Sequence, residues 1–407
     1  MGDILFLAHR IPFPPDRGDK IRAHHLLNHL ATLAPVHVGC FAENAKDRAA
    51  ECELVHLAAS YCLVDRRKPL ALAGAEAVLS DKPVSLTAFH SHALEQWVRQ
   101  SIAHRDIETI VIFSGQMGQY VPDDFTGRVV IDLCDVDSVK FEDYAAAGER
   151  VWINRREGRL LAVEEERLAH RADATILISE NEKSVLQCRL RNAVDTHIRS
   201  IGNGIDAAYF DPSMVAPHPE IASREGPHFV FTGQMDYRPN EKAAIWAIAA
   251  FLPEIRSRFP GAELHIVGRC PTPALLGHSG ELGVNIWGEV PDVRPFLAAA
   301  DMAVVPLTIA RGVQNKVLEA MAMELPVMLT SEAATGITAQ DGRDWLVEPV
   351  LAGAMLRRFE QVWSDSVTRR NIGKSARQFV LANHSWPAML APLKELVSPS
   401  GTRRDAA

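Results

Sequence analysis

Short apolar runs alternate with amphipathic stretches along the first half of the chain. Six of these runs have the length and apolar character of buried β-strands: 3–8, 36–42, 61–65, 108–113, 128–133 and 174–179. The stretch 20–34 places its leucines on one face of a helix, and 148–171 predicts a long charged helix. Strands that alternate with helices predict a parallel sheet joined by right-handed crossovers.

The same pattern restarts in the second half. Residues 200–228 are rich in Gly, Pro, Asp and Ser and show no periodicity, which predicts an interdomain linker. Six further strands are predicted beyond it: 228–233, 262–268, 284–288, 302–307, 326–330 and 345–349. The predicted fold class is therefore α/β, with two Rossmann-like domains whose parallel sheets face a central cleft.

The predicted domains are 1–202 and 228–380, joined by the linker 203–227. A helix over 381–396 is expected to pack back on the first domain, and the polar tail 397–407 is expected to fray. Strands that are apolar on both faces need helices on both sides of each sheet. Ligands of such sheets bind at the carboxyl ends of the strands, so we expect the chemistry at that edge.

Composition and charge narrow the class of protein. The 407 residues are 47% hydrophobic and 23% charged, which is typical of a soluble protein with two or three domains. The net charge of −8 argues against nucleic acid as a partner. The six cysteines form no CxxC pair, so we expect buried thiols in a reducing compartment. Since no apolar run approaches the ~20 residues of a membrane span, and the first run lacks the features of a signal peptide, a cytoplasmic location is predicted.

The stretch RGVQNKVLEAMAMELPVML (311–329) predicts a loop, a helix and a strand. The amide groups from Val313 to Lys316 would point out of the helix N-terminus and form an anion site suited to phosphate. Glu319 lies one turn further along, on a small apolar face where a carboxylate needs a partner. A ribose diol offers two donors to one carboxylate. The alternatives are an exposed helix glutamate or an ion pair with a structural arginine.

Two loops of the first half carry further polar candidates. The proline-rich loop 12–20 bends at Gly18 before a helix, so Gly18 and Asp19 are expected to face the cleft, although Asp19 could instead be a helix N-cap. Asp132, Asp135 and Asp137 follow a strand, and grouped acids suggest metal binding or acid–base work. Ser114 ends another strand.

The ordered set of motifs resembles the family 4 retaining glycosyltransferases with the GT-B fold. The segments that carry the resemblance are GIDAAYFDP, AELHIVG, VNIWGEVPDVRPFLAAADMAVVPL and VLEAMAMELPVMLT, with LAHRIPFPPDRGDKIRAHHLLNHLA near the N-terminus. The variants PPDRGDKIR, DLCDVDS, FTGQMDYRPN and RGVQNKVLEAMAM resemble a sugar-transferase branch associated with exopolysaccharide and PEP-CTERM/exosortase gene clusters. The resemblance covers nearly the whole chain.

The resemblance implies transfer of a sugar, with retention, from a nucleotide diphosphate sugar held by the second domain to an acceptor at the first. Glu319 matches the second Glu of the family's Glu-x7-Glu pattern, which contacts the ribose, whereas Arg311 stands where the first Glu is expected. Gln234 likewise replaces a phosphate-binding Arg, so Arg238 and Lys242 become the candidate cations on the diphosphate.

The resemblance thus implies three groups of residues. The catalytic candidates are Asp19, Arg238 and Lys242. The donor-binding candidates are Gly18, Gly233, Arg311, Gly312, Val313, Gln314, Asn315, Lys316 and Glu319. The acceptor-binding candidates are Arg17, Ser114 and Asp135. Neither a metal nor another cofactor is expected, because GT-B enzymes generally need no catalytic metal.

Other functions stay open at this point. A nucleotide-sugar epimerase or hydrolase would use the same fold, and the departures at Arg311 and Gln234 suit a non-catalytic nucleotide-binding subunit. A dinucleotide oxidoreductase is disfavoured because no GxGxxG follows a first strand. The expected partners are a nucleotide sugar and a glycan or lipid-linked acceptor. Peripheral membrane contact through Arg155, Arg156 and Arg159 is left open, since the glutamates at 164–166 favour a solvated face.

Overall fold

The computed structural model describes residues 2–310 and 312–398 of the chain. The chain forms two compact units. The first contains the residues up to Asn203 and the segment from Met389 onward, and the second contains Gly204–Ala388. The segment predicted as a linker, 203–227, thus contributes nearly all of its length to the second unit, where it carries the short helix α10 (Pro219–Ala222) and a bridge from Ile205 to Ser385.

Within the described residues, the first unit is built on a seven-stranded sheet of order β3-β2-β1-β4-β5-β6-β7, in which all pairs are parallel. Its strands are β1 (Asp3–Ala8), β2 (Val36–Ala42), β3 (Ser60–Asp65), β4 (Ile107–Phe113), β5 (Arg128–Cys134), β6 (Ala174–Leu177) and β7 (Ile198–Ser200). The six strands predicted from apolar runs are confirmed. The three-residue β7 was not predicted, because a single buried Ile198 followed by Arg199 gives no apolar run.

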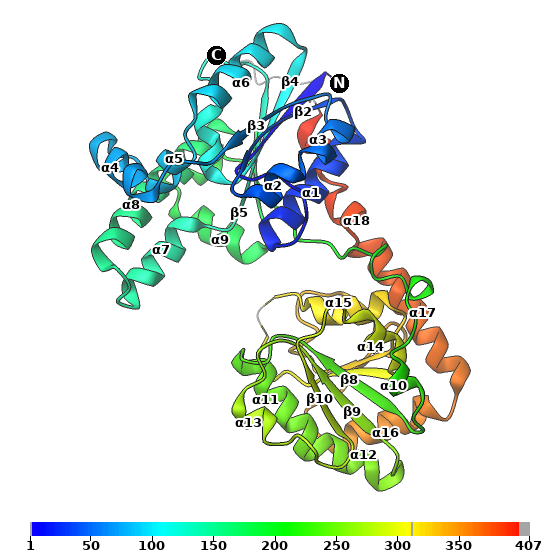
Figure 1. Cartoon of the computed structure of the whole chain (residues 1–407). Coiled ribbons are helices and arrows are strands. Elements are labelled where there is room, and N and C mark those ends of the chain that lie inside the picture. Colours follow the sequence, from blue (N-terminus) through cyan, green and yellow to red (C-terminus); the bar gives the residue numbers. More distant parts are fainter. Residues whose placement is uncertain (1, 311, 399–407) are drawn as a thin grey trace. The chain divides into compact units, whose positions relative to one another are not determined.

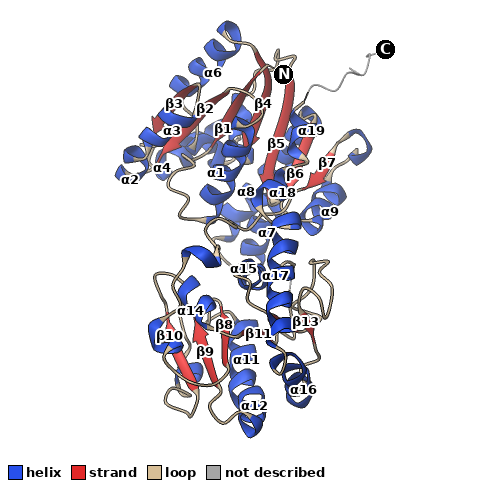
Figure 2. Cartoon of the chain, turned by 90° about the vertical axis from the view of Figure 1, so that its right-hand side faces the viewer, coloured by secondary structure: helices blue, strands red, loops and turns tan. Residues whose placement is uncertain are grey.

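Helices cover both faces of this sheet, as its strands require, because β1, β2 and β5 are buried almost throughout (Figure 2). The helices are α1 (Gly18–Ala31), α2 (Ala45–Ala49), α3 (Glu51–Leu57), α4 (Leu70–Ser80), α5 (Val84–Ala88), α6 (His92–His104), α7 (Asp137–Ala146), α8 (Val151–Arg171) and α9 (Glu180–Arg189). The predicted long charged helix is α8.

In the described part of the second unit, six parallel strands have the order β10-β9-β8-β11-β12-β13 (Figure 1). They are β8 (His228–Thr232), β9 (Glu263–Val267), β10 (Val284–Gly288), β11 (Met302–Val305), β12 (Val327–Leu329) and β13 (Leu346–Val347). All six match predicted runs. The helices after α10 are α11 (Arg238–Trp246), α12 (Leu252–Arg258), α13 (Pro273–Leu276), α14 (Arg294–Ala299), α15 (Asn315–Ala322), α16 (Ala352–Trp363) and α17 (Ser366–Asn383).

The C-terminal segment returns to the first unit. It carries α18 (Trp386–Leu390), at the boundary between the units, and α19 (Leu393–Val397). The carbonyl of Val397 accepts a hydrogen bond from Thr109 Oγ1 at 3.0 Å, and that of Leu396 accepts one from Arg128 Nε at 2.5 Å. Leu393 and Val397 are fully buried, so α19 is part of the hydrophobic core of this unit.

Strand order determines where each sheet can hold a ligand. In each sheet the order reverses at one point, between β1 and β4 in the first unit and between β8 and β11 in the second. At such a point the loops after two neighbouring strands diverge to opposite faces and leave a crevice at the carboxyl edge. Each unit therefore has one expected site, and both fall on segments singled out in the sequence.

None of the helices found in residues 2–310 and 312–398 combines the length and apolar character needed to cross a bilayer.

Candidate functional site

The crevice of the second unit is bordered by the loop after β8 and by the loop that leads from β11 into α15. Gly312 has φ +72°, a left-handed backbone that suits glycine. The N-cap of α15 is Gln314, whose side chain makes no capping bond and instead donates to the carbonyl of Gly312 at 3.0 Å. Among the described residues, no acceptor pairs with the amides of Gln314 and Lys316. These groups are available to an anion.

Lys316 reaches from α15 across to the loop after β8. Its Nζ donates to Asn240 Oδ1 at 2.6 Å and lies 4.4 Å from the centre of the Phe231 ring. Asn240 in turn donates to the carbonyl of Gln234 at 2.9 Å. Burial lowers the pKa of Lys316 to about 8, against the opposing charge of Glu319. The ammonium is thus poorly solvated and has one hydrogen-bond acceptor among the described residues, which suits it to a second, anionic partner.

Gly233 makes room for this lysine. Its φ is +151°, and a Cβ at this position would lie 2.8 Å from Lys316 Nζ and 2.9 Å from Asn240 Nδ2. The absence of a side chain therefore keeps the lysine and the asparagine at the strand end. Gly233 and Lys316, both predicted donor-binding residues, are brought together by the pairing of β8 with β11.

Glu319 lies one turn after Lys316 and is half-buried. In the described chain its carboxylate has neither a hydrogen bond nor an ion pair, so the alternative of a structural arginine partner has no support there. Burial raises the pKa of Glu319, and the nearby Lys316 charge only partly offsets this. A half-buried carboxylate without a protein partner is costly, and it is satisfied when a ligand supplies hydroxyl donors.

The position of the replaced phosphate-binding arginine has an unexpected neighbour. Arg269, which follows β9, donates from Nη2 to Gln234 Oε1 at 2.7 Å. Arg238 and Lys242, the predicted cations, lie exposed on the first turns of α11 and have no polar partner among the described residues. Sequence reasoning missed Arg269 because it follows a different strand, and only the pairing of β8 with β9 brings it to Gln234. Arg311 lies outside the described residues.

In the first unit, Asp19 occupies the first turn of α1 beside the crevice between β1 and β4. Its carboxylate lies 2.7 Å from Arg10 Nη1, 3.2 Å from His9 Nε2 and 3.2 Å from Arg17 Nε. Burial acts to raise the pKa of Asp19, but the hydrogen bond with His9 and the charge of Arg10 outweigh it and hold the pKa far below its ordinary value. Asp19 is thus ionised at neutral pH. The N-cap of α1 is Arg17, so the alternative of Asp19 as an N-cap was wrong.

His9, Arg10 and Glu43 complete this cluster and were not singled out in the sequence. Arg10 Nε and Arg17 Nη2 both donate to Glu43, at 2.7 and 2.9 Å. His9 is buried, stacks on Phe113 with ring centres 5.6 Å apart, and its Nδ1 has no hydrogen-bond partner among the described residues. The signal was the pair His-Arg directly after the first strand, in LAHR. The space next to Gly18 is open, because a Cβ built on this residue would have no neighbouring atom within 4 Å.

Of the remaining candidates in the first unit, one acid has a structural role and another is accessible to a ligand. Asp132 is fully buried and paired with Arg22 at 2.8 Å, and Arg22 also donates to the carbonyl of Ile201. This acid joins α1 to the sheet and is not free for metal or acid–base work. Asp135, in contrast, has an exposed side chain after β5, and partial desolvation of its carboxyl together with the nearby charges of Glu182 and Asp137 raises its pKa. Ser114 has φ +76° and donates to Gln116 Oε1 at 2.7 Å.

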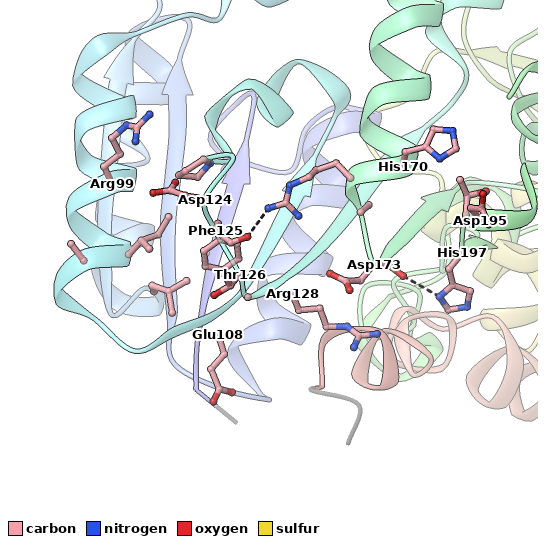
Figure 3. Close-up of a pocket in the computed structure, with 18 of the residues that line it drawn as sticks. Arg99, Glu108, Asp124, Phe125, Thr126, Arg128, His170, Asp173, Asp195 and His197 are labelled. Carbon is pink, nitrogen blue, oxygen red and sulfur yellow. Dashed lines mark hydrogen bonds between the residues drawn. The ribbon is translucent and has the colours of Figure 1, made fainter. Parts of the chain in front are cut away.

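A large cavity lies at the opposite edge of this sheet. It has a volume of about 1230 Å³ and is lined by residues at the starts of strands, among them Glu108, Arg128, Asp173 and His197 (Figure 3). The amino ends of parallel strands are not where doubly wound sheets bind ligands. Its lining contains none of the predicted site residues.

Two parallel α/β sheets, each with a polar site at its switch point, define the class of the protein as the GT-B fold, as predicted. Residues 226–365, which lie in the second unit, match the family described as Glycosyl transferases group 1. This range contains Gly233, Lys316 and Glu319.

Similar proteins agree with this class. The chain is 30% identical over 155 residues to a phosphatidyl-myo-inositol mannosyltransferase of Mycolicibacterium smegmatis, a match that covers 37% of this chain and 38% of that protein. A sucrose-phosphate synthase of Thermosynechococcus elongatus has a similar fold, with a TM-score of 0.57, 18% identity and coverage of 97% of this chain and 98% of the other. Anabaena HepE, solved with UDP and glucose, gives a TM-score of 0.58 at 15% identity, with 97% and 99% covered.

Proposed function

We propose that this protein is a retaining glycosyltransferase that moves a sugar from a nucleotide diphosphate sugar to a glycan or lipid-linked acceptor. The observation that carries the proposal is the half-buried Glu319 carboxylate, which has no hydrogen-bond or ion-pair partner among the described residues and lies one turn from the lysine and the amides at the start of α15. A nucleoside diphosphate matches both groups, because its ribose supplies hydroxyl donors and its diphosphate supplies negative charge.

In this proposal the second unit holds the donor and stabilises the leaving group. The diphosphate would accept hydrogen bonds from the amides of Gln314 and Lys316 and would pair with the Lys316 ammonium. Negative charge that develops on the departing diphosphate is thereby met by groups already in place. Arg269, through its position beside Gln234, is a further cation at the same edge. We propose that no metal ion is required.

The acceptor would bind at the first unit, near Asp19, Ser114 and Asp135. Because Asp19 stays ionised, it can accept a hydrogen bond from an acceptor hydroxyl and orient it, but it cannot act as a proton donor. With the acceptor on the same face as the leaving group, attack and departure on one side retain the configuration at the transferred carbon. Arg238 and Lys242 remain proposals as catalytic cations, on the grounds that they are exposed and unpaired among the described residues.

The biological setting is also proposed. The branch resemblance suggests polysaccharide synthesis, and the curated relative named a phosphatidyl-myo-inositol mannosyltransferase supports a lipid-linked acceptor as one option. All six cysteines are free, which suits the reducing cytoplasm, but Cys52, Cys188 and Cys270 are exposed, so the expectation of buried thiols was wrong for these three.

The test is a thermal-shift and calorimetric screen of UDP, GDP, ADP and TDP and of their sugars, followed by turnover of the donor that binds. Glu319→Gln keeps the size of the side chain but removes the charge that accepts the ribose hydroxyls. We expect kcat/KM for the donor to fall about tenfold to a hundredfold, the range for a hydrogen bond to a charged group. Exposed Glu289→Gln in the same unit is the matched control. If KM and kcat for the donor are unchanged in Glu319→Gln, Glu319 does not bind the ribose. If the protein isomerises the donor when no acceptor is present, it is an epimerase and not a transferase.

A further inference from the structure

Helix α4 exposes its larger apolar side chains instead of burying them. Its sequence, LALAGAEAVLS, has one charged residue, Glu76, which is bound by Lys68 at 2.7 Å. The side chains that it buries are only Ala73 and Ala77. Leu70, Leu72, Val78 and Leu79 are exposed by between 52% and 88%. A helix that is apolar on all sides and lies at a surface needs another apolar phase or a partner to cover it.

The first turns of α8 extend this apolar surface. Trp152 is 70% exposed and Ile153 is 48% exposed. Arg156 Nη2 donates to the carbonyl of Ala77 at 2.7 Å and thereby ties α8 to the end of α4 (Figure 1). Glu157, one residue later, accepts from the amides of Val84 and Ser85 at 2.8 and 3.0 Å. We call the exposed apolar side chains of α4 together with Trp152 and Ile153 the α4–α8 surface.

The charge around the α4–α8 surface is opposite to that of the whole chain. The stretches 66–82 and 150–159 contain eight arginines and lysines and three carboxylates, whereas the chain has a formal net charge of −8. Two of these cations, Arg66 and Arg67, already pair with Glu43 at 2.9 Å and with Asp65 at 2.7 Å, so the excess positive charge rests on the others. Arg155 and Lys82 are exposed and have no side-chain partner among the described residues. Two of the three carboxylates, Glu76 and Glu157, are engaged in the bonds just described, and the third, Asp81, lies 3.6 Å from Arg156.

We propose that the α4–α8 surface docks on an anionic lipid bilayer. Exposed leucines and a tryptophan enter the boundary between headgroups and acyl chains, and flanking arginines and lysines pair with lipid phosphates, which is how amphipathic helices lie on membranes. Each basic residue held near an anionic leaflet adds attraction that decreases with salt. Because the charge around this surface is positive although the chain as a whole is acidic, an anionic bilayer is a better partner for it than an uncharged apolar surface.

The position of the surface in the fold fits this partner. Helix α4 follows β3, and the α7–α8 pair follows β5, so both are inserted where strands leave the carboxyl edge of the sheet. The predicted acceptor residues belong to that same edge. Docking of the α4–α8 surface on a bilayer does not require that the protein transfers a sugar.

The experiment is flotation of the full-length protein with vesicles of phosphatidylcholine alone and of phosphatidylcholine mixed with phosphatidylglycerol. We expect the protein to float with the mixed vesicles and not with the neutral ones, and to be released at high salt. Leu79→Ser with Trp152→Ser changes two exposed side chains, so the fold should be unaffected. This variant should lower partitioning at least about tenfold, because it removes two large apolar side chains that the bilayer would otherwise bury.

Matched controls distinguish vesicle binding through the α4–α8 surface from non-specific hydrophobic adsorption. Val194→Ser with Leu282→Ser removes two equally exposed apolar side chains that lie outside the α4–α8 surface, and it should leave partitioning unchanged. Arg155→Glu should weaken binding to the mixed vesicles at low salt, while Trp152→Phe should retain it. Equal flotation of the Leu79→Ser/Trp152→Ser variant and the natural protein would overturn the proposal. A second result would also overturn the proposal: the natural protein does not bind vesicles, light scattering shows that it is a dimer, and the variant is a monomer. The α4–α8 surface would then be covered by a second copy of the chain.

Discussion

Lys316 shows how one residue joins two distant parts of the sequence. Burial against Phe231 and Asn240 lowers its pKa to about 8, so its charge is available at neutral pH and lost in mild alkali. Sequence reasoning placed Lys316 at a helix N-terminus as a source of charge. It could not place the ammonium beside Gly233, because that contact depends on the pairing of β8 with β11.

The pH dependence of donor use follows from this pKa. In the free enzyme a neutral Lys316 loses its attraction for the diphosphate, so kcat/KM for the donor should fall as the pH rises through about 8. Lys316→Met should lower kcat/KM at pH 7 and flatten this alkaline limb. A pH–rate profile of both proteins from pH 6 to about 10 checks the prediction. An alkaline limb that persists unchanged in Lys316→Met would assign it to another group.

Gly233 is the residue on which the lysine position depends. An alanine there must accept φ +151° and place its methyl group 2.8 Å from Lys316 Nζ. Gly233→Ala should therefore displace Lys316 and raise the donor KM about tenfold or more, with a loss of stability of about 1–3 kcal/mol from backbone strain. Gly277→Ala is the control, because Gly277 has no positive φ and a new Cβ there meets atoms only at 3.3 Å and beyond. Donor titration and thermal unfolding of both variants separate the two effects.

At the scale of elements, the strands were predictable and the polar contacts between them were not. Each apolar run that was predicted as a strand forms one, because burial on both faces leaves an unbroken apolar signal in the sequence. The cluster of His228, His265 and Trp287 gives no such signal. It forms across three neighbouring strands, from the start of β8, the middle of β9 and the end of β10, with His265 fully buried.

The buried His265 makes the stability of the second unit depend on pH. Its Nδ1 accepts from Trp287 Nε1 and its Nε2 faces His228 Nδ1, both at 3.2 Å. Burial, assisted by the His228 charge, lowers the pKa of His265 to about 3. The folded protein therefore keeps this ring neutral, whereas the unfolded chain takes up a proton below pH 6.5. Its contribution to the free energy of unfolding should be lost at about 1.4 kcal/mol per pH unit as the pH falls from 6.5 towards 3.

A comparison with His265→Gln measures that contribution. The variant should be less stable than the natural protein at pH 7 and should lose less stability between pH 6.5 and 4.5. Urea unfolding at several pH values gives both curves. Parallel curves would show that His265 does not titrate on unfolding.

At the scale of the whole molecule, the chain passes between the two units twice, after Asn203 and again before Met389. The first unit is completed by a segment more than 180 residues away in sequence, since α19 packs on β5 and its carbonyls accept from Thr109 and Arg128. We therefore expect the stability of the first unit to depend on this C-terminal segment. The sequence predicted a helix over 381–396 that packs back on the first domain. The structure divides this range among the end of α17, α18 and α19, and β5 as the strand against which α19 packs could not be predicted.

Leu393→Ala tests this dependence. Leu393 is fully buried in the first unit, so the cavity should lower the free energy of unfolding by about 2–5 kcal/mol. Lys394→Ala, at the exposed neighbouring position, should change it by less than about 0.5 kcal/mol. Calorimetry of the full chain gives the unfolding temperature. A large effect of Lys394→Ala, or none of Leu393→Ala, would contradict the packing of α19.

The sequence by itself determined that the chain forms two parallel α/β sheets and that residues 311–329 contain a helix start suited to phosphate, because apolar periodicity and backbone amides are local properties. Only the tertiary structure decided which polar groups share an edge: Lys316 with Gly233, Arg269 with Gln234, and Asp19 with Arg10. It also decided that the leucines of α4 face outward. Strand order and helix packing are set by contacts between residues far apart in the chain, and hydrophobic patterning specifies that a face is buried but not against what.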